Sequence, residues 1–480
     1  MTGRLFLLVW VLRLSISAAQ SQEVDITDYL AQYNMEWTAS HPYLLQYAFQ
    51  PFYQASIRHE NFGGDFRPAF RDQNYSDFGF HSRSQKAIKN WNLLGAFSYR
   101  KILDRTKPYL LQKEASSYNP YVIADNQVES WGADHIDFSL SAMSPAWMDR
   151  FRTYAVVRYD VSSGHRKAEP RPLYRHSKFL LEIGNQMLLN QNFHIGIGGA
   201  FAQHLEENTV GSFAVQDFSL HQLRGISTFT RNTYQAFQRN QKESRLTGKA
   251  FLSYAKNHDW GFLEFATQSG QFDARDGIAV PEDGGSVESK TYATSLGFNK
   301  SFSGKIWQTG AKYTNRSSIG IDPIFRAINY DFASTIYNAR TSLTQHNSFW
   351  RQIAVDLAFI NEQRDEIAGG NFLHFQNIEL KLGTDLVLPI LKSNKLWLSP
   401  LIGIRSNQKS AYQQNSTGLI GEIFNQEIDY YSSDALLAHI KLMWLSQFKE
   451  QQLMFTLHLS TERTAELHYN TLSVDMGLLF

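Results

Sequence analysis

Apolar and polar residues alternate along extended stretches of this chain, most clearly in residues 468–480, HYNTLSVDMGLLF. Side chains of a β-strand point alternately to opposite faces, so this stretch has one apolar and one mostly polar face. About 10 residues suffice to cross a bilayer as a tilted strand. With its final aromatic residue, the stretch predicts a transmembrane strand that closes a β-barrel, with an apolar face made of Leu472, Val474, Met476, Leu478 and Phe480.

The same alternation recurs from about residue 48 to the end of the chain. Clear examples lie at 152–161, 353–359, 378–388 and 438–444. Counting these segments gives about 18 strands (16–18), and single-chain bacterial barrels have an even number. Tryptophans lie toward predicted strand ends, where aromatic girdles of membrane barrels are found, at Trp91, Trp260, Trp307, Trp397 and Trp444.

The predicted connections fall into two alternating classes. Short turns are expected at 190–192, 257–259, 303–304 and 447–450, and long loops at 60–75, 102–134, 206–243, 274–289, 318–332 and 408–427. If the first strand starts in the periplasm, every short turn is periplasmic and every long loop extracellular. A soluble β-sandwich or propeller has no reason to sort its loops in this way. The sequence therefore predicts an all-β fold, a transmembrane up-and-down antiparallel β-barrel.

The N-terminus has the layout of a secretory signal. Arg4 precedes an apolar run over residues 5–16, and small residues follow at 17–19. This pattern predicts a signal peptide over 1–19 that is cleaved on export, rather than a buried N-terminal helix. Residues 20–47 are then a pre-barrel segment, periplasmic or lumenal, and residues 48–480 form the barrel. The expected location is the cell outer membrane.

Composition removes several classes of function. The 46 basic and 45 acidic residues nearly balance, so the basic excess of a nucleic-acid-binding protein is absent. The chain has no cysteine, which excludes disulfides, thiolate metal sites and a cysteine nucleophile. A mean hydropathy of -0.36 is too polar for a helical membrane protein, but it fits a barrel whose strands have one polar face.

The polar faces of the predicted strands carry charges of both signs. In a barrel these side chains line the lumen, where they border a water-filled path or pair with each other across it; pairing is the favoured interpretation. Mixed signs predict no simple ion selectivity. The lumen-lining candidates are Arg152, Arg158, Asp160, Lys178, Glu182, Lys249, Glu264, Asp356, Glu379, Lys381, Asp385, His439, Lys441, His458 and Asp475.

No motif nominates a catalytic, cofactor or metal site. The densest histidine and aspartate cluster, residues 134–137, has no metal-ligand spacing such as HExxH, and His165 and His176 share one predicted loop. A solvated or hydrogen-bonded histidine is favoured for each. Gly196 and Gly198 fall inside a strand, where small residues make room on the wall. Without a GxSxG elbow or a P-loop, an enzyme is not expected, and an outer-membrane hydrolase is a distant alternative.

The Gly/Asn turns, the aromatic C-terminal strand and the Trp37–Pro42 segment resemble those of Gram-negative outer-membrane barrels in the size class of porins and capsule-assembly barrels. The chain is most similar to an uncharacterised outer-membrane β-barrel family associated with TonB-dependent receptors. The resemblance implies an accessory or scaffold role in uptake or surface assembly, with outer-membrane lipid and a TonB-dependent receptor or surface lipoprotein as partners. Loops 102–134 and 206–243 favour a partly occluded lumen; the alternative is a passive, porin-like pore for small solutes.

Overall fold

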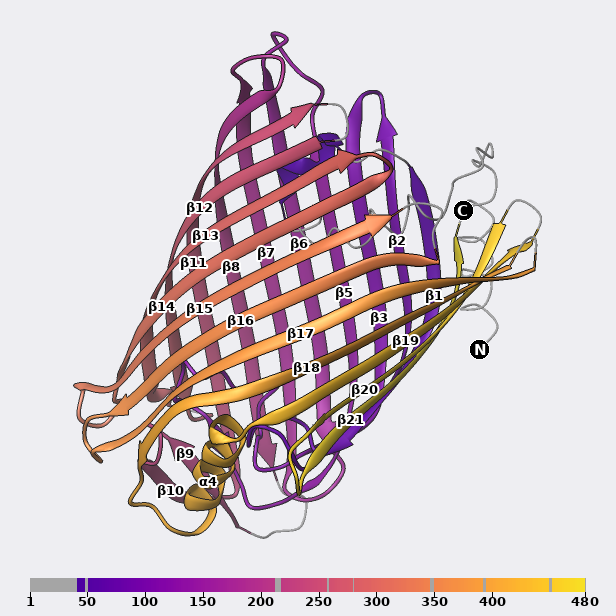
Figure 1. Cartoon of the computed structure of the whole chain (residues 1–480). Helices are drawn as coiled ribbons and strands as arrows, with labels where there is room; N and C mark the ends of the chain where they lie inside the picture. Colours follow the sequence, from indigo (N-terminus) through magenta and orange to yellow (C-terminus); the bar gives the residue numbers. More distant parts are fainter. Residues whose placement is uncertain are drawn as a thin grey trace, which may run out of the picture.

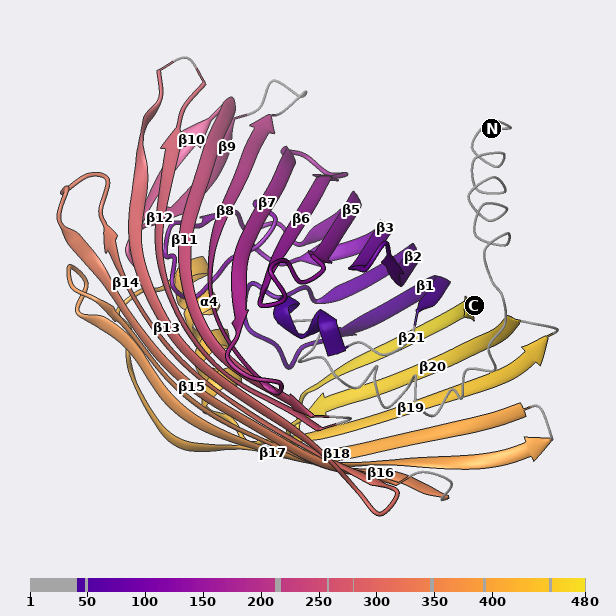
Figure 2. The same ribbon diagram turned by 90° about the horizontal axis from the view of Figure 1, so that it is seen from above.

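The computed structural model describes residues 41–47, 51–211, 217–256, 259–278, 280–345, 349–391, 394–448 and 451–479. Eighteen antiparallel strands form one sheet, and the sheet closes because β1 (Phe52–Gly64) pairs with both β2 (Asn74–Ile88) and β21 (His468–Leu479). The strands are labelled in Figure 1, and Figure 2 shows β1 and β21 side by side at this closure. The predicted fold class is confirmed. The predicted signal peptide, Phe480 and most of the pre-barrel segment lie outside the described residues.

Each remaining barrel strand pairs with the barrel strands before and after it along the chain. These strands are β3 (Trp91–Lys107), β5 (Glu129–Met143), β6 (Phe151–Arg166), β7 (Arg171–Leu188), β8 (Phe193–Gly211), β11 (Ala236–Lys256), β12 (Asp259–Asp276), β13 (Glu282–Phe302), β14 (Lys305–Ile321), β15 (Ile328–Gln345), β16 (Trp350–Glu366), β17 (Asn371–Leu391), β18 (Asn394–Gln413), β19 (Ala435–Phe448) and β20 (Gln451–Arg463).

Among the residues that the structure describes, few elements lie outside the barrel wall. A small sheet contains β4 (Ile123–Ala124), β9 (Phe218–Leu223) and β10 (Phe229–Tyr234), and the helices are η1 (Pro42–Tyr47) and α4 (Gly418–Ser432). None of the helices in the described part of the chain is both long and apolar enough to span a membrane.

The outward face of the barrel carries a belt of exposed apolar side chains. Large apolar residues exposed to water are unfavourable in such number, so the belt faces lipid. The alternation predicted from the sequence places these residues opposite the buried and polar ones on each strand. Examples from five strands are Ile197, Leu246, Leu357, Leu382 and Ile402.

The two ends of the barrel differ. One end, called here the long-loop end, holds the connections 65–73, 108–128 and 414–434, and Figure 1 shows α4, β9 and β10 gathered there. The opposite, short-turn end holds two-residue hairpins such as Lys89–Asn90 and Ser303–Gly304, whose positive φ values suit tight β-turns. In outer-membrane barrels the long loops are extracellular.

The strands extend well beyond the apolar belt at the long-loop end. In β11, Gln238, Asn240 and Lys242 follow the same outward face as Leu246 but are polar. Backbone pairing continues there in water, although the apolar alternation has ended. The predicted long loops at 206–243, 274–289 and 318–332 are therefore wrong in extent, because much of their sequence forms this raised rim. The β12–β13 connection, for example, is only 277–281.

Two of the five tryptophans assigned to an outer girdle are placed differently by the structure. Trp91, Trp307 and Trp444 face outward and are exposed, but Trp260 and Trp397 are 5% exposed and face the interior. A position near a strand end does not determine which face of the sheet the side chain is on. A shift of one residue along the strand moves the side chain to the opposite face.

The apolar belt predicts that the cost of introducing a charged residue depends on its position along a strand. Leu357→Arg puts a guanidinium in the middle of the belt and should destabilise the barrel by about 2–4 kcal/mol in urea unfolding from lipid vesicles. Gln363→Arg lies on the same face of β16 but on the rim, so it should change the free energy of unfolding by less than about 1 kcal/mol. Equal costs at both positions would contradict the assignment of the belt.

Candidate functional site

Residues 108–128, which connect β3 to β5 and are called here the inner segment, fold against the inward face of the barrel at the long-loop end. The β4 strand of the inner segment pairs with β9, and β9 pairs with β10. Leu111 and Ile123 pack with Phe218 and Leu220 of β9 in one buried apolar cluster. Inward-facing wall residues complete the cluster, among them Tyr75, Trp131, Tyr174, Val210 and Phe237.

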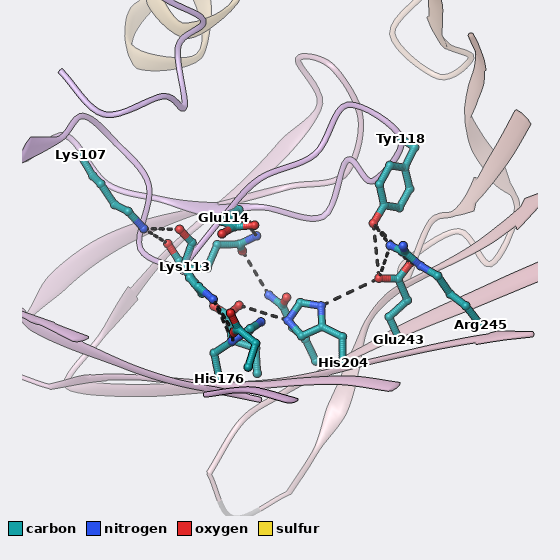
Figure 3. A network of polar contacts seen from close by, with 12 residues as sticks. Lys107, Lys113, Glu114, Tyr118, His176, His204, Glu243 and Arg245 are labelled. Atoms are coloured by element: carbon teal, nitrogen blue, oxygen red, sulfur yellow. Dashed lines mark hydrogen bonds and ion pairs between the residues drawn. The ribbon is translucent and has the colours of Figure 1, made fainter. Parts of the chain in front are cut away.

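Lys113 ties the inner segment to the barrel wall (Figure 3). Its Nζ lies 3.0 Å from Asp160 Oδ1 on β6 and 3.0 Å from His176 Nδ1 on β7. Its backbone N–H donates to Glu206 Oε1 on β8 at 2.7 Å. Lys107, at the end of β3, donates to the carbonyl of Gln112 at 2.6 Å. One lysine side chain and the adjacent backbone thus contact three wall strands.

A second set of contacts forms around Tyr118. Arg245 donates to the Tyr118 hydroxyl at 2.7 Å and makes a two-point ion pair with Glu243, 2.8 Å at each oxygen. The Arg316 guanidinium lies 4.9 Å from the centre of the Tyr118 ring, a cation–π distance. Burial raises the pKa of Tyr118 above its ordinary value, so the hydroxyl stays protonated at neutral pH.

Two buried arginine–aspartate pairs hold the same segment. Arg166 of β6 makes a bidentate pair with Asp125 at 3.0 and 2.7 Å, and both side chains are at most 3% exposed. Arg239 of β11 pairs with Asp276 of β12 at 2.6 and 2.7 Å and also donates to the Tyr121 carbonyl. Buried charges are stable only when paired, so these pairs fix the position of the inner segment.

Helix α4 packs inside the long-loop end through one face. Ile420, Ile423 and Phe424 are buried against other inward-folded residues. Glu427, on the same face, accepts from Arg364 of β16 at 2.9 Å and from the backbone N–H of Ala69 at 2.7 Å. This helix lies partly within the predicted loop 408–427 and was not predicted, although Ile420, Ile423, Phe424 and Ile428 recur at the spacing of one helical face.

At the short-turn end, η1 lies against the inward face of β3, β5 and β6. Tyr43 stacks on Phe251 of β11 with ring centres 3.8 Å apart, and His41 Nδ1 lies 3.1 Å from Glu264 Oε2 of β12. A Cβ added at Gly198 would overlap Tyr154, and one at Gly196 would overlap Phe251. These glycines make room on the inner wall for the aromatic side chains that contact η1.

One small cavity lies between the inner segment and the wall. A cavity of about 200 Å³ is lined by Lys113, Glu114 and Tyr118 from the segment and by wall residues including His176, His204 and Glu243. A cavity of this size has room for several water molecules, because one water takes about 30 Å³ in the liquid. A larger hollow of about 790 Å³ is lined mainly by residues of the outward face, such as Leu459 and Leu472, so it lies on the outside of the barrel wall.

The cross-strand register places all fifteen predicted lumen-lining residues on the face opposite the apolar belt. Some are paired: Lys249 with Glu182 at 2.8 Å and Lys381 with Glu379 at 2.8 Å. The His439 and His458 rings lie 4.0 Å apart. The structure does not bring the fifteen together in one site, and a role in a water-filled path stays a prediction.

Sequence analysis missed most residues of the site described above. Lys113 and Tyr118 lie in a predicted loop, and Glu243 and Arg245 lie at the border of another. The only signal for His176 was its presence in a histidine-containing loop. Contacts between residues 50 to 130 positions apart depend on strand register and on how the inner segment folds, which periodicity does not report.

Comparison with known families gives one match over nearly the whole described chain. Residues 42–480 match the model of a family of unknown function, DUF6850. The chain belongs to this family. A comparison with curated proteins found no match. The expected association with TonB-dependent receptors is not part of the family description, so it stays a prediction.

Several solved outer-membrane proteins are similar in structure. The ferric yersiniabactin uptake receptor FyuA from Yersinia pestis gives a TM-score of 0.46 at 8% identity over 90% of this chain and 80% of that chain. The ferric preacinetobactin receptor BauA from Acinetobacter baumannii gives 0.41 at 9% over 89% and 80%, and OccK11 (OpdR) from Pseudomonas aeruginosa gives 0.38 at 8% over 90% and 96%. With scores below 0.5, these similarities transfer neither substrate nor mechanism.

The Arg166–Asp125 pair predicts how the inner segment can be released. Arg166→Met leaves the Asp125 carboxylate buried without its partner, which costs about 3–5 kcal/mol. We expect trypsin to cleave the folded protein in detergent after Lys113 at least tenfold faster than in the wild type. Adding Asp125→Asn should remove most of this increase, because the neutral amide needs no counterion. Arg171→Met, which removes one partner of an exposed pair with Glu169, is the control. Equal cleavage rates in Arg166→Met and Arg171→Met would contradict the role of the Arg166–Asp125 pair as an anchor.

Proposed function

We propose that this protein is an outer-membrane β-barrel whose lumen is closed by its own segments, and that it serves as an accessory or scaffold component of an uptake or surface-assembly system. The observation that carries the proposal is the inner segment, anchored to the inward wall by buried ion pairs and an apolar cluster. A solute-conducting pore needs a continuous water path, and a path cannot pass through fully buried side chains such as Trp131 and Tyr121.

The short-turn end supports the same proposal. Tyr43, Leu44 and Leu45 of η1 are at most 3% exposed and lie among inward-facing aromatic side chains of the wall. Closure at both ends favours a barrel that works through contacts with other molecules. The resemblance to barrels associated with TonB-dependent receptors favours such a receptor, or a surface lipoprotein, as the partner. Export through a cleaved signal peptide at 1–19 is part of the proposal, and it includes no enzymatic step.

Conductance in planar bilayers tests the closure. We expect the wild type to be silent, and three variants separate the two ends: residues 109–126 replaced by a Gly/Ser linker of equal length, residues 41–47 replaced likewise, and both replacements together. Only the double replacement should give large, stable openings, because either end alone blocks the path. The same replacement at 464–467, a connection with only local hydrogen bonds, is the control and should be silent.

Other results would overturn the proposal. Large, stable openings of the wild type would favour a passive, porin-like channel. A silent double replacement that remains folded would show that these segments do not close the lumen. For the partner, the tagged protein should co-purify in mild detergent with a second outer-membrane protein in a fixed ratio; recovery of the barrel alone from its native membrane would contradict the accessory role.

A further inference from the structure

Three metal-ligand atoms converge on the inner wall beside Lys113. His135 and Asp137 are two positions apart on β5, so both side chains face the interior. The β5–β6 register pairs Asp137 with Asp160. The ligand atoms of these three residues all lie within 4.8 Å of one another. His135 Nε2 is 2.9 Å from Asp160 Oδ2. Metal ligands at about 2.1 Å from an ion are separated from each other by about 3 Å, so the spacing suits neighbouring ligands.

The two carboxylates of this cluster are unevenly neutralised. Asp160 contacts Lys113, His135 and His176. Within the described part of the chain, by contrast, the Asp137 carboxylate makes no side-chain hydrogen bond or ion pair. Two carboxylates held close together repel each other, and a shared cation relieves the repulsion. The arrangement therefore favours an additional positive charge between Asp137 and Asp160.

Lys113 supplies a positive charge on one side of the cluster only. Its ammonium group lies between two atoms that are themselves metal-ligand types, Asp160 Oδ1 and His176 Nδ1, at 3.0 Å from each. The lysine belongs to the inner segment, whereas His135, Asp137, Asp160 and His176 belong to the wall. It therefore acts as a tethered cation that can leave without disturbing the wall strands.

We propose that His135, Asp137 and Asp160, with His176 beside them, form a binding site for a divalent transition-metal cation such as Zn²⁺, and that the metal displaces Lys113. Imidazole with carboxylate selects borderline ions such as Zn²⁺ and Co²⁺, whereas Ca²⁺ takes six to eight oxygen ligands. The site uses residues that the sequence analysis did not nominate as ligands. It goes beyond the proposed function, since it rests on the wall cluster whether or not the lumen conducts.

Titration of the full-length, chelator-treated protein in detergent, purified without a histidine tag, tests the site. Zn²⁺ is followed by calorimetry and Co²⁺ by its visible absorption. We expect Lys113→Met to bind Zn²⁺ at least tenfold more tightly than the wild type, because the competing ammonium is gone. Asp137→Asn should bind at least tenfold more weakly, with an unchanged melting temperature as evidence of folding. Ca²⁺ should show no binding at the same concentrations.

The matched control is Lys381→Met, which removes a positive charge from the inward face of β17, a strand that does not adjoin β5 or β6. It should change Zn²⁺ affinity less than threefold. An increase equal to that of Lys113→Met would overturn the displacement of Lys113. No Zn²⁺ binding by Lys113→Met at 1 mM, on the order of the weakest specific affinities, would overturn the site. Undiminished binding by Asp137→Asn, or equal binding of Ca²⁺, would overturn the proposed ligand set.

Discussion

The structure depends on the pairing of every backbone N–H and C=O group that faces lipid. The bilayer core offers no water to these groups, so strands can cross it only in a sheet without free edges. Pairing of β1 with β21, from Gln54–Leu479 to Gly64–Tyr469, removes the last two edges. The closed sheet has eighteen strands. A barrel of that size leaves an interior too wide for the side chains of its own wall to fill.

That width explains the unusual content of the lumen. Inward side chains such as Arg166, Arg239 and Asp276 would meet water in an open channel, yet they are nearly fully buried. They are buried because the inner segment and the small sheet lie against them. A buried charge is stable only when an opposite charge lies within contact distance. Each ion pair therefore favours the one arrangement of the inner segment in which its two partners meet. The wall residues thus fix the position of the segments inside the barrel, and those segments neutralise the charges of the wall. This supports the proposed closure.

The parts that could be predicted from sequence are those governed by local periodicity. Leu357 and Leu382 alternate with polar neighbours, and this was enough for the fold class and the approximate strand number. The same rule failed on the rim, where Gln238 and Arg239 are both polar although the strand continues. It also failed for Trp260 and Trp397, whose face depends on register. The site itself depends on contacts such as Lys113–Asp160, which join distant segments and leave no trace in a single sequence.

The segments that the proposed function assigns to closing the lumen are held at the two ends by different contacts. At the short-turn end the contacts are mainly aromatic, with Tyr43 on Phe251 and glycines on β7 and β8 making the space. Such contacts depend on shape and respond little to salt. At the long-loop end an apolar cluster is joined by buried ion pairs such as Arg166–Asp125, which salt screens only weakly, and by the contact of Lys113 with Asp160 of the β5–β6 cluster. A change that loosens one set of contacts therefore need not loosen the other, and a cation that replaced Lys113 at the proposed metal site would act on the long-loop end alone.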